Sequence, residues 1–100
     1  MKLKILPSAA ADLVQGAGFY ERQAEGLGAY FLDTLFSDVE SLVLYAGIHR
    51  KINGYYRLLS RRFPYAVYYT IDEDQVRVWR ILDCRRDPQK IRTALSGRDG

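Results

Sequence analysis

The sequence predicts an α+β domain in which a helical hairpin packs on one face of a mainly antiparallel sheet of four strands. Apolar residues recur at helical spacing in two consecutive stretches of the first half. In the second half the apolar period changes to two, which is the period of a strand, over three consecutive stretches. A chain of 100 residues suits a single domain with one modest core, and we expect residues 1–100 to form it.

The chain opens with a short predicted strand, residues 2–6, which Pro7 ends. Ser8 then stands where the N-cap of a helix is expected, and Asp12 would favour the positive end of that helix from its first turn. The helix itself is indicated by apolar residues at i, i+3, i+4, i+7, i+10 and i+14, namely Ala10, Leu13, Val14, Ala17, Tyr20 and Ala24.

A second helix is predicted after a break at residues 26–28, Gly-Leu-Gly. Its apolar stripe continues for about four turns until Gly47 and consists of Leu32, Leu35, Phe36, Val39, Leu42, Val43 and Ala46. Because the link between the two helices is so short, they must fold back on each other as an antiparallel hairpin.

Three strands are predicted after a basic loop at residues 48–54. The first spans residues 55–61, and the second shows strict apolar alternation along residues 63–71. A polar turn at residues 72–74 leads to the third strand, residues 76–82.

The alternation along this last strand places Val76, Val78 and Leu82 on one face and Trp79 and Ile81 on the other. Both faces of the sheet are therefore expected to be at least partly covered. The face opposite the hairpin is expected to leave room for a partner or a substrate.

A short terminal helix completes the predicted order β-α-α-β-β-β-α. Pro88 suits the first turn of that helix and Asp87 its cap, whereas residues 96–100 are expected to form a frayed tail.

Composition excludes several classes of protein. The chain has one cysteine, Cys84, and one histidine, His49, so neither an internal disulfide nor a structural zinc site is expected, and no cofactor or metal is implied. The N-terminal apolar run stops at Pro7, too early for a signal peptide, and no segment approaches about 18 apolar residues. We expect a cytoplasmic protein that does not enter a membrane.

Charge is distributed unevenly along the chain. Residues 1–49 carry three basic and six acidic side chains, a net charge of −3, whereas residues 50–100 carry twelve basic and six acidic side chains, a net charge of +6. This asymmetry indicates that the second half meets an anion, such as nucleic acid or an acidic protein segment. A solvated basic face without a partner is the plainer interpretation.

Five arginines are the candidate binding residues. Arg57 and Arg61 have the same parity on one predicted strand and should point to the same face. Arg80 stands among apolar neighbours on the last strand, and Arg85 and Arg86 follow that strand directly. The planar guanidinium suits phosphates and carboxylates, so this group is a candidate site for RNA, for an acidic peptide, or for both.

Other side chains have a structural and a functional interpretation that both stay open. His49 is either a solvated loop residue or a general base, and Cys84, beside two arginines, is either a small buried residue or a thiol of lowered pKa. Tyr56 and Tyr68 either fill the sheet or stack on bases. The sequence contains no hydrolase motif and no glycine-rich phosphate loop.

Two segments together resemble a known family. Residues 63–69, Phe-Pro-Tyr-Ala-Val-Tyr-Tyr, followed after one strand by residues 85–88, Arg-Arg-Asp-Pro, resemble the paired signature of ParE-like toxins in the RelE/ParE toxin–antitoxin superfamily. Tyr56 and Arg57 at the start of the preceding strand fit as well, and the resemblance covers roughly residues 2–95. It implies a toxin of a type II system that is neutralised by a cognate antitoxin, whose C-terminal segment wraps the toxin in a hetero-oligomer.

The resemblance leaves two activities to weigh. ParE-like members inhibit DNA gyrase, whereas RelE-like members cut messenger RNA in the ribosome. Cations stand at Arg57 and Arg86, and these two would be the catalytic residues of a nuclease. The other positions at which RelE-like enzymes carry cations or a tyrosine hold Leu59, Ala66 and, near the C-terminus, Ile91 or Arg92. An acid–base pair is hard to assemble from arginines alone, so gyrase inhibition is favoured. A non-catalytic RNA-binding module and a scaffold protein are the remaining alternatives.

Overall fold

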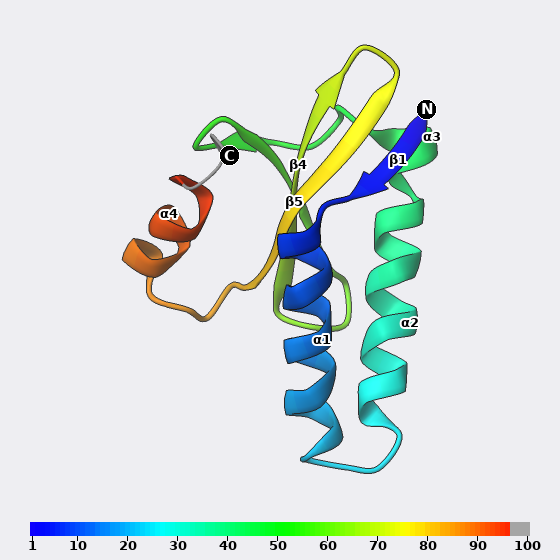
Figure 1. The fold of residues 1–100 in the computed structure, drawn as a ribbon, viewed down its shortest axis with the longest axis vertical. Coiled ribbons are helices and arrows are strands. Elements are labelled where there is room, and N and C mark those ends of the chain that lie inside the picture. The colour runs from blue at the N-terminus through cyan, green and yellow to red at the C-terminus, as the bar shows by residue number, and fades with distance from the viewer. Residues whose placement is uncertain (97–100) are drawn as a thin grey trace.

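A computed structural model describes residues 1–96 (Figure 1). The predicted α+β class and the order of the main elements are confirmed, with two short elements added. The elements are β1 (Lys2–Ile5), α1 (Pro7–Glu21), α2 (Leu27–Glu40), α3 (Leu42–Tyr45), β2 (Lys51–Ile52), β3 (Tyr55–Leu59), β4 (Tyr65–Asp72), β5 (Gln75–Asp83) and α4 (Pro88–Ser96). Of the tail expected at 96–100, Ser96 ends α4, and residues 97–100 lie outside the described residues.

The sheet has five strands in the order β1-β5-β4-β3-β2, so the predicted count of four is wrong by one. The extra strand, β2, lies in the segment expected to be a loop. It forms a tight hairpin with β3 through Asn53 and Gly54, whose φ angles of 54° and 83° are both left-handed. Asn-Gly is the residue pair that such a two-residue turn favours. β1 runs parallel to β5, and the other neighbours are antiparallel.

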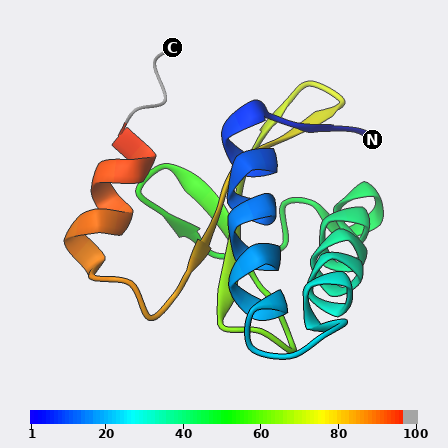
Figure 2. The ribbon, with the colours of Figure 1, turned by 60° about the horizontal axis from the view of Figure 1, so that its bottom comes forward.

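The hairpin of α1 and α2 covers one face of the sheet, whereas α4 lies on the other side (Figure 2). The main core lies between the hairpin and the sheet and includes Leu13, Phe31, Leu35, Val39, Val67, Tyr69, Val78 and Ile81. Complete burial of an apolar side chain of this size contributes about 1.5–3 kcal/mol.

Helix α1 begins two residues earlier than predicted. Pro7 occupies its first position, where the missing N–H has no intrahelical partner to lose. The N-cap is therefore Leu6, without a side-chain cap, and the prediction for Ser8 is wrong. Asp12 lies beyond the first turn and is buried.

The buried face of α1 is also rotated from the predicted stripe. Val14 is 71 % exposed, and Ala24 lies past the end of the helix. Leu13 and Tyr20 of the predicted stripe are buried, and the other buried residues are Ala9, Asp12 and Gly16. A glycine and a carboxylate belong to this face, and an apolar pattern counts neither of them.

Helix α2 starts within the segment that was predicted to be a break. Gly26 stands just before it with a left-handed φ of 86°, and the carboxylate of Glu21 accepts hydrogen bonds from the N–H groups of Gly26 (3.0 Å) and Gly28 (2.9 Å). A Cβ on Gly28 would lie 2.6 Å from the carbonyl oxygen of Ala17, so this glycine lets the two helices approach closely.

The predicted apolar stripe of α2 is correct in part. Leu35 and Val39 are buried, but Phe36 is 41 % exposed and the fully buried Phe31 was missed. The helix ends at Glu40, and the predicted continuation past Ser41 is the separate turn α3.

A β-bulge changes the face assignment on β5. The register between β4 and β5 shifts between Tyr68 and Tyr69, which inserts Trp79 as an extra residue on β5. Every later residue then lies on the face opposite to the one predicted. Ile81 packs into the hairpin core and Leu82 into the cluster under α4.

Helix α4 partly covers the sheet face that was expected to be open. Its Leu95 is buried against Ala66, Tyr68 and Leu82, and the Tyr55 hydroxyl donates a 2.7 Å hydrogen bond to the Leu95 carbonyl. The predicted start of this helix is confirmed, because the Asp87 carboxylate accepts a hydrogen bond from the N–H of Gln89.

Candidate functional site

The five candidate arginines do not form a single cluster. Arg57 lies on the α4 face of the sheet, and Arg80 lies at the edge of β5 next to α1. Arg85 and Arg86 follow β5 on the side of α1. Arg61 is in the turn after β3, so the prediction that it shares a strand face with Arg57 is wrong.

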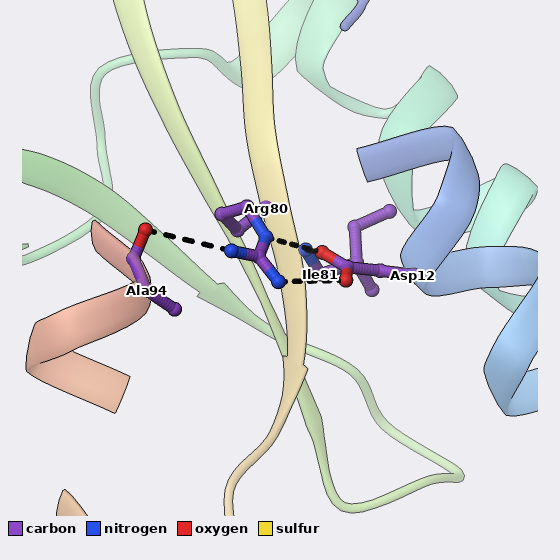
Figure 3. Close-up of polar contacts among 4 residues, drawn as sticks. All are labelled: Asp12, Arg80, Ile81 and Ala94. Atoms are coloured by element: carbon purple, nitrogen blue, oxygen red, sulfur yellow. Dashed lines mark hydrogen bonds and ion pairs between the residues drawn. The ribbon is translucent and has the colours of Figure 1, made fainter. Parts of the chain in front are cut away.

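Arg80 is held in an ion pair with Asp12 of α1 (Figure 3). Its Nε and Nη2 donate to the two carboxylate oxygens at 2.7 and 2.9 Å. The same carboxylate accepts the backbone N–H of Ile81 at 2.9 Å, on the part of β5 that lies beyond β1. Nη1 reaches the carbonyl of Ala94 in α4 at 3.5 Å. Arg80 thus joins α1, β5 and α4, and its guanidinium is already occupied.

Sequence reasoning missed the role of Asp12. Asp12 follows Ala9 by three residues and precedes Gly16 by four, so helical spacing places its carboxylate on the buried face of α1 with them. That position was the signal for a buried ion pair. Only 8 % of the Asp12 side chain is exposed, and a carboxylate so buried requires a partner. The hydrogen bonds from Arg80 raise the pKa of that guanidinium above its ordinary value.

Arg85 and Arg86 line a hollow of about 340 Å³ beside α1, together with the exposed ring of Phe19. Arg85 is paired with Asp83 through a 2.7 Å contact and holds the pKa of that carboxyl below its usual range. Burial raises the pKa of Tyr65, which also lines the hollow, to about 12. Arg86 is therefore the arginine of this pair that is placed to meet an added anion.

Arg57 lies across from Tyr68 on the α4 face. Its Nη2 is 3.8 Å from the sulfur of Cys84, and its Nε is buried without a hydrogen-bond partner among residues 1–96. Burial raises the pKa of Tyr68, although the charge of Arg57 opposes that rise.

Arg61 belongs to a separate groove, of about 910 Å³, between α2 and the outer edge of β3. We call it the α2–β3 groove, and its principal lining residues are Tyr30, Asp38, Tyr45, His49, Leu59 and Arg61. Arg62 also lines it and donates a 2.7 Å hydrogen bond to the hydroxyl of Tyr30. The sequence reading assigned only Arg61 of these residues to a binding surface.

His49 is fixed in place rather than solvated. Its Nδ1 is 2.5 Å from the hydroxyl of Tyr69, which also accepts the N–H of Gly47 at 3.0 Å. The hydroxyl of Tyr69 and Nδ1 of His49 share one hydrogen bond, and the tautomer of the ring sets which of the two donates. Burial lowers the pKa of His49, which favours the neutral ring.

Among residues 1–96, no group of three or more His, Cys, Asp or Glu side chains is placed to hold a metal ion. Over the same residues, no helix is both long enough and apolar enough to cross a bilayer.

Comparison with known proteins identifies the family. The model of the ParE toxin of the type II toxin–antitoxin system parDE matches residues 3–88, and the chain belongs to this family. A solved structure described as the chromosomal ParDE TA system from P. aeruginosa superposes with a TM-score of 0.72 at 24 % identity, over 81 % of this chain and 92 % of that chain. It shows the same fold. No curated protein matches the chain.

Proposed function

We propose that this member of the ParE toxin family acts by inhibiting DNA gyrase and is neutralised by a cognate antitoxin. Membership of the family supports the toxin–antitoxin assignment, and gyrase is the target that the ParE-like resemblance implies. The proposal includes a hetero-oligomeric complex with the antitoxin and a cytoplasmic place of action, since gyrase is found there.

The observation that supports binding over RNA cleavage is that Arg57 and Arg86 line different surfaces of the fold. Cleavage through a 2′-hydroxyl needs a base, an acid and a cation within hydrogen-bond reach of one phosphate. Arg57 faces α4, whereas Arg86 lines the hollow beside α1 on the hairpin side. Tyr68, which lies across from Arg57 on β4, has a raised pKa and keeps its proton at neutral pH. This arrangement favours a toxin that binds its target.

The proposal is tested first in cells and then with purified components. Expression should arrest growth, and co-expression of the antitoxin encoded beside it should restore growth. The purified toxin should block supercoiling of plasmid DNA by gyrase. Normal growth at a confirmed level of folded protein would count against the whole proposal.

A second measurement separates the two toxin activities. Ribosome-bound messenger RNA from arrested cells should show no cuts in phase with codons. Codon-phased cuts, abolished by Arg57→Ala and Arg86→Ala together, would replace gyrase inhibition by RNA cleavage. Salt-dependent affinity for RNA without either activity would favour an RNA-binding module.

A further inference from the structure

We propose that the hollow beside α1 receives an acidic side chain of the toxin's protein target, with the carboxylate bound between the guanidinium of Arg86 and the hydroxyl of Tyr65. The inference rests on the proposed action on gyrase and specifies the surface through which the toxin meets that protein. Three features of the hollow carry it: a hydroxyl without a hydrogen-bond partner, an arginine outside any ion pair, and an exposed aromatic ring.

The hydroxyl of Tyr65 is the first feature. Tyr65 is only 8 % exposed, and its ring packs against Phe31 in the hairpin core. Its hydroxyl forms no hydrogen bond with any of residues 1–96. The oxygen lies beside Gly16, where an added Cβ would be 3.3 Å away, and both residues line the hollow. A tyrosine this buried usually has a partner for its O–H, so the group favours a ligand that accepts a hydrogen bond.

The protonation state of Tyr65 makes this hydroxyl a donor. Burial raises the pKa of Tyr65 to about 12, so the hydroxyl keeps its proton at neutral pH. A ligand that fits must therefore present an acceptor, and a carboxylate oxygen is a strong one.

Arg86 supplies the positive charge of the hollow. Two carboxylates and two arginines line it. Asp12 is held by Arg80, which bonds to both of its oxygens. Asp83 is held by Arg85. The half-buried Arg86 forms no ion pair with any of residues 1–96. Once the two pairs are counted, one positive charge is left for a ligand.

This charge balance favours a protein carboxylate over nucleic acid. A single carboxylate carries one negative charge and accepts hydrogen bonds at both oxygens, which matches one guanidinium and one hydroxyl. A nucleic-acid strand would bring a further phosphate with every nucleotide. Those charges would be repelled by Asp83 in the lining and by the exposed Asp87, the residue that follows Arg86.

Phe19 is the third feature, and it gives the hollow an apolar side. Its ring is 41 % exposed and lines the hollow next to Gln15, which stands one turn earlier on α1. Aromatic rings and arginines are enriched where proteins bind proteins, and this ring can pack against the methylene groups of an aspartate or glutamate.

The size of the hollow distinguishes the target from the antitoxin. A volume of about 340 Å³ suits one side chain, whereas a segment that wraps the toxin needs a longer surface, such as the α2–β3 groove of about 910 Å³. We therefore assign the hollow to a single acidic side chain on the surface of the target.

The site is tested first on the full-length toxin alone, with acetate as the probe. Sodium acetate, exchanged for sodium chloride at constant ionic strength, should shift the amide NMR signals of Gly16 and Arg86 to saturation. Arg86→Gln should abolish this binding, and Tyr65→Phe should weaken it about threefold, since it removes one donor. Tighter binding of inorganic phosphate than of acetate would identify a phosphate site and overturn the assignment.

The same variants are then compared in gyrase supercoiling assays. Arg86→Gln should raise the toxin concentration for half-inhibition by about tenfold, because the target's carboxylate then lacks its counter-charge. Tyr65→Phe should raise it about threefold. Arg77→Gln is the matched control, since it removes one positive charge from β5 outside the hollow, and it should leave inhibition unchanged.

Stability and antitoxin binding are the further readouts. Tyr65→Phe keeps the ring in the core and removes only an oxygen without a partner, so circular dichroism and thermal unfolding should show an unchanged fold. All variants should bind the antitoxin encoded beside the toxin with the dissociation constant of the unaltered chain. If Arg86→Gln weakens the antitoxin complex and leaves gyrase inhibition unchanged, the hollow belongs to the antitoxin and the assignment is overturned.

The outcomes separate this inference from the proposed function. If the unaltered toxin inhibits gyrase, while Arg86→Gln and Tyr65→Phe inhibit as strongly as Arg77→Gln does, the hollow is not the contact surface. In that case the hollow assignment fails and gyrase inhibition stands. Failure of the unaltered toxin to inhibit gyrase would overturn the proposed function and the assignment of the acidic side chain to that target, even where acetate binds.

Discussion

The two faces of the sheet are covered in different ways. The hairpin face is buried under the length of α1 and α2, and its core is aromatic and aliphatic throughout. Among residues 1–96, the other face is covered by α4 alone, a helix of nine residues in which only Leu95 is buried. Beneath or beside that helix lie polar groups, among them the guanidinium of Arg57 and the hydroxyl of Tyr68.

The two faces of the sheet therefore contribute unequally to the stability of the fold. The hairpin face supplies most of the stability, because burial is complete there. The α4 face has a thin cover over a mixed polar and aromatic surface, so α4 should detach at a smaller cost in free energy than either hairpin helix. Arg80 connects the two sides, since it bonds to Asp12 of α1 and reaches Ala94 of α4.

Phe31→Ala should give the largest effect. The ring is fully buried and packs against Tyr20, Phe63 and Tyr65. Its loss leaves a cavity in the hairpin core and should lower the free energy of unfolding by about 4 kcal/mol. Urea denaturation followed by circular dichroism measures this value. A loss no greater than that of Leu95→Ala would break the comparison between the two faces.

Asp12→Ala should cost about 3 kcal/mol. The substitution leaves the Arg80 guanidinium without its carboxylate and the Ile81 N–H, at the sheet edge, without its acceptor. Because the Arg80 side chain is partly exposed (25 %), the cost should be at the lower end for a broken ion pair. The same denaturation experiment applies. Arg85→Ala is the control, because its pair with Asp83 is exposed and its loss should change stability far less.

Leu95→Ala should cost about 2 kcal/mol, the lower end for a buried leucine, because α4 can shift to fill the space. Hydrogen exchange should accelerate in residues 88–96 while the amides of α1 and α2 keep their protection. Uniform acceleration throughout the chain would show that α4 belongs to the same cooperative unit as the hairpin.

Acid should reduce stability through His49, and this is the smallest effect. Burial lowers the pKa of His49 from 6.5, so below that pH the unfolded chain binds a proton that the folded chain resists. Stability from this residue is present above pH 6.5 and is lost as the pH falls through the window below it. Urea midpoints at about pH 7.5 and about pH 5.5 should differ less in His49→Gln than in the unaltered chain. Equal pH dependence in both proteins would assign the acid effect to the carboxylates instead.

Much of the fold was readable from local pattern. Helical spacing gave the hairpin, alternation gave β3, β4 and β5, and Asp87 with Pro88 gave the start of α4. Asn53-Gly54 also carried the signal for the missed strand β2, since that pair favours a two-residue hairpin turn. The α2–β3 groove could not be predicted from local pattern, because Asp38, Tyr45 and Leu59 come from separate segments and meet only in the folded chain.

The sequence by itself determined which segments are helices and strands, because periodicity is a property of neighbouring residues along the chain. The tertiary structure alone decided which arginines are paired within the fold and which stay exposed. Arg80 pairs with Asp12, which is 68 positions away in the sequence, whereas Arg61 stays exposed beside the groove. It also decided that Ile81 and Leu82 exchange faces, since a bulge depends on the register between two strands. Both outcomes are set by contacts between distant segments, and local spacing does not encode such contacts.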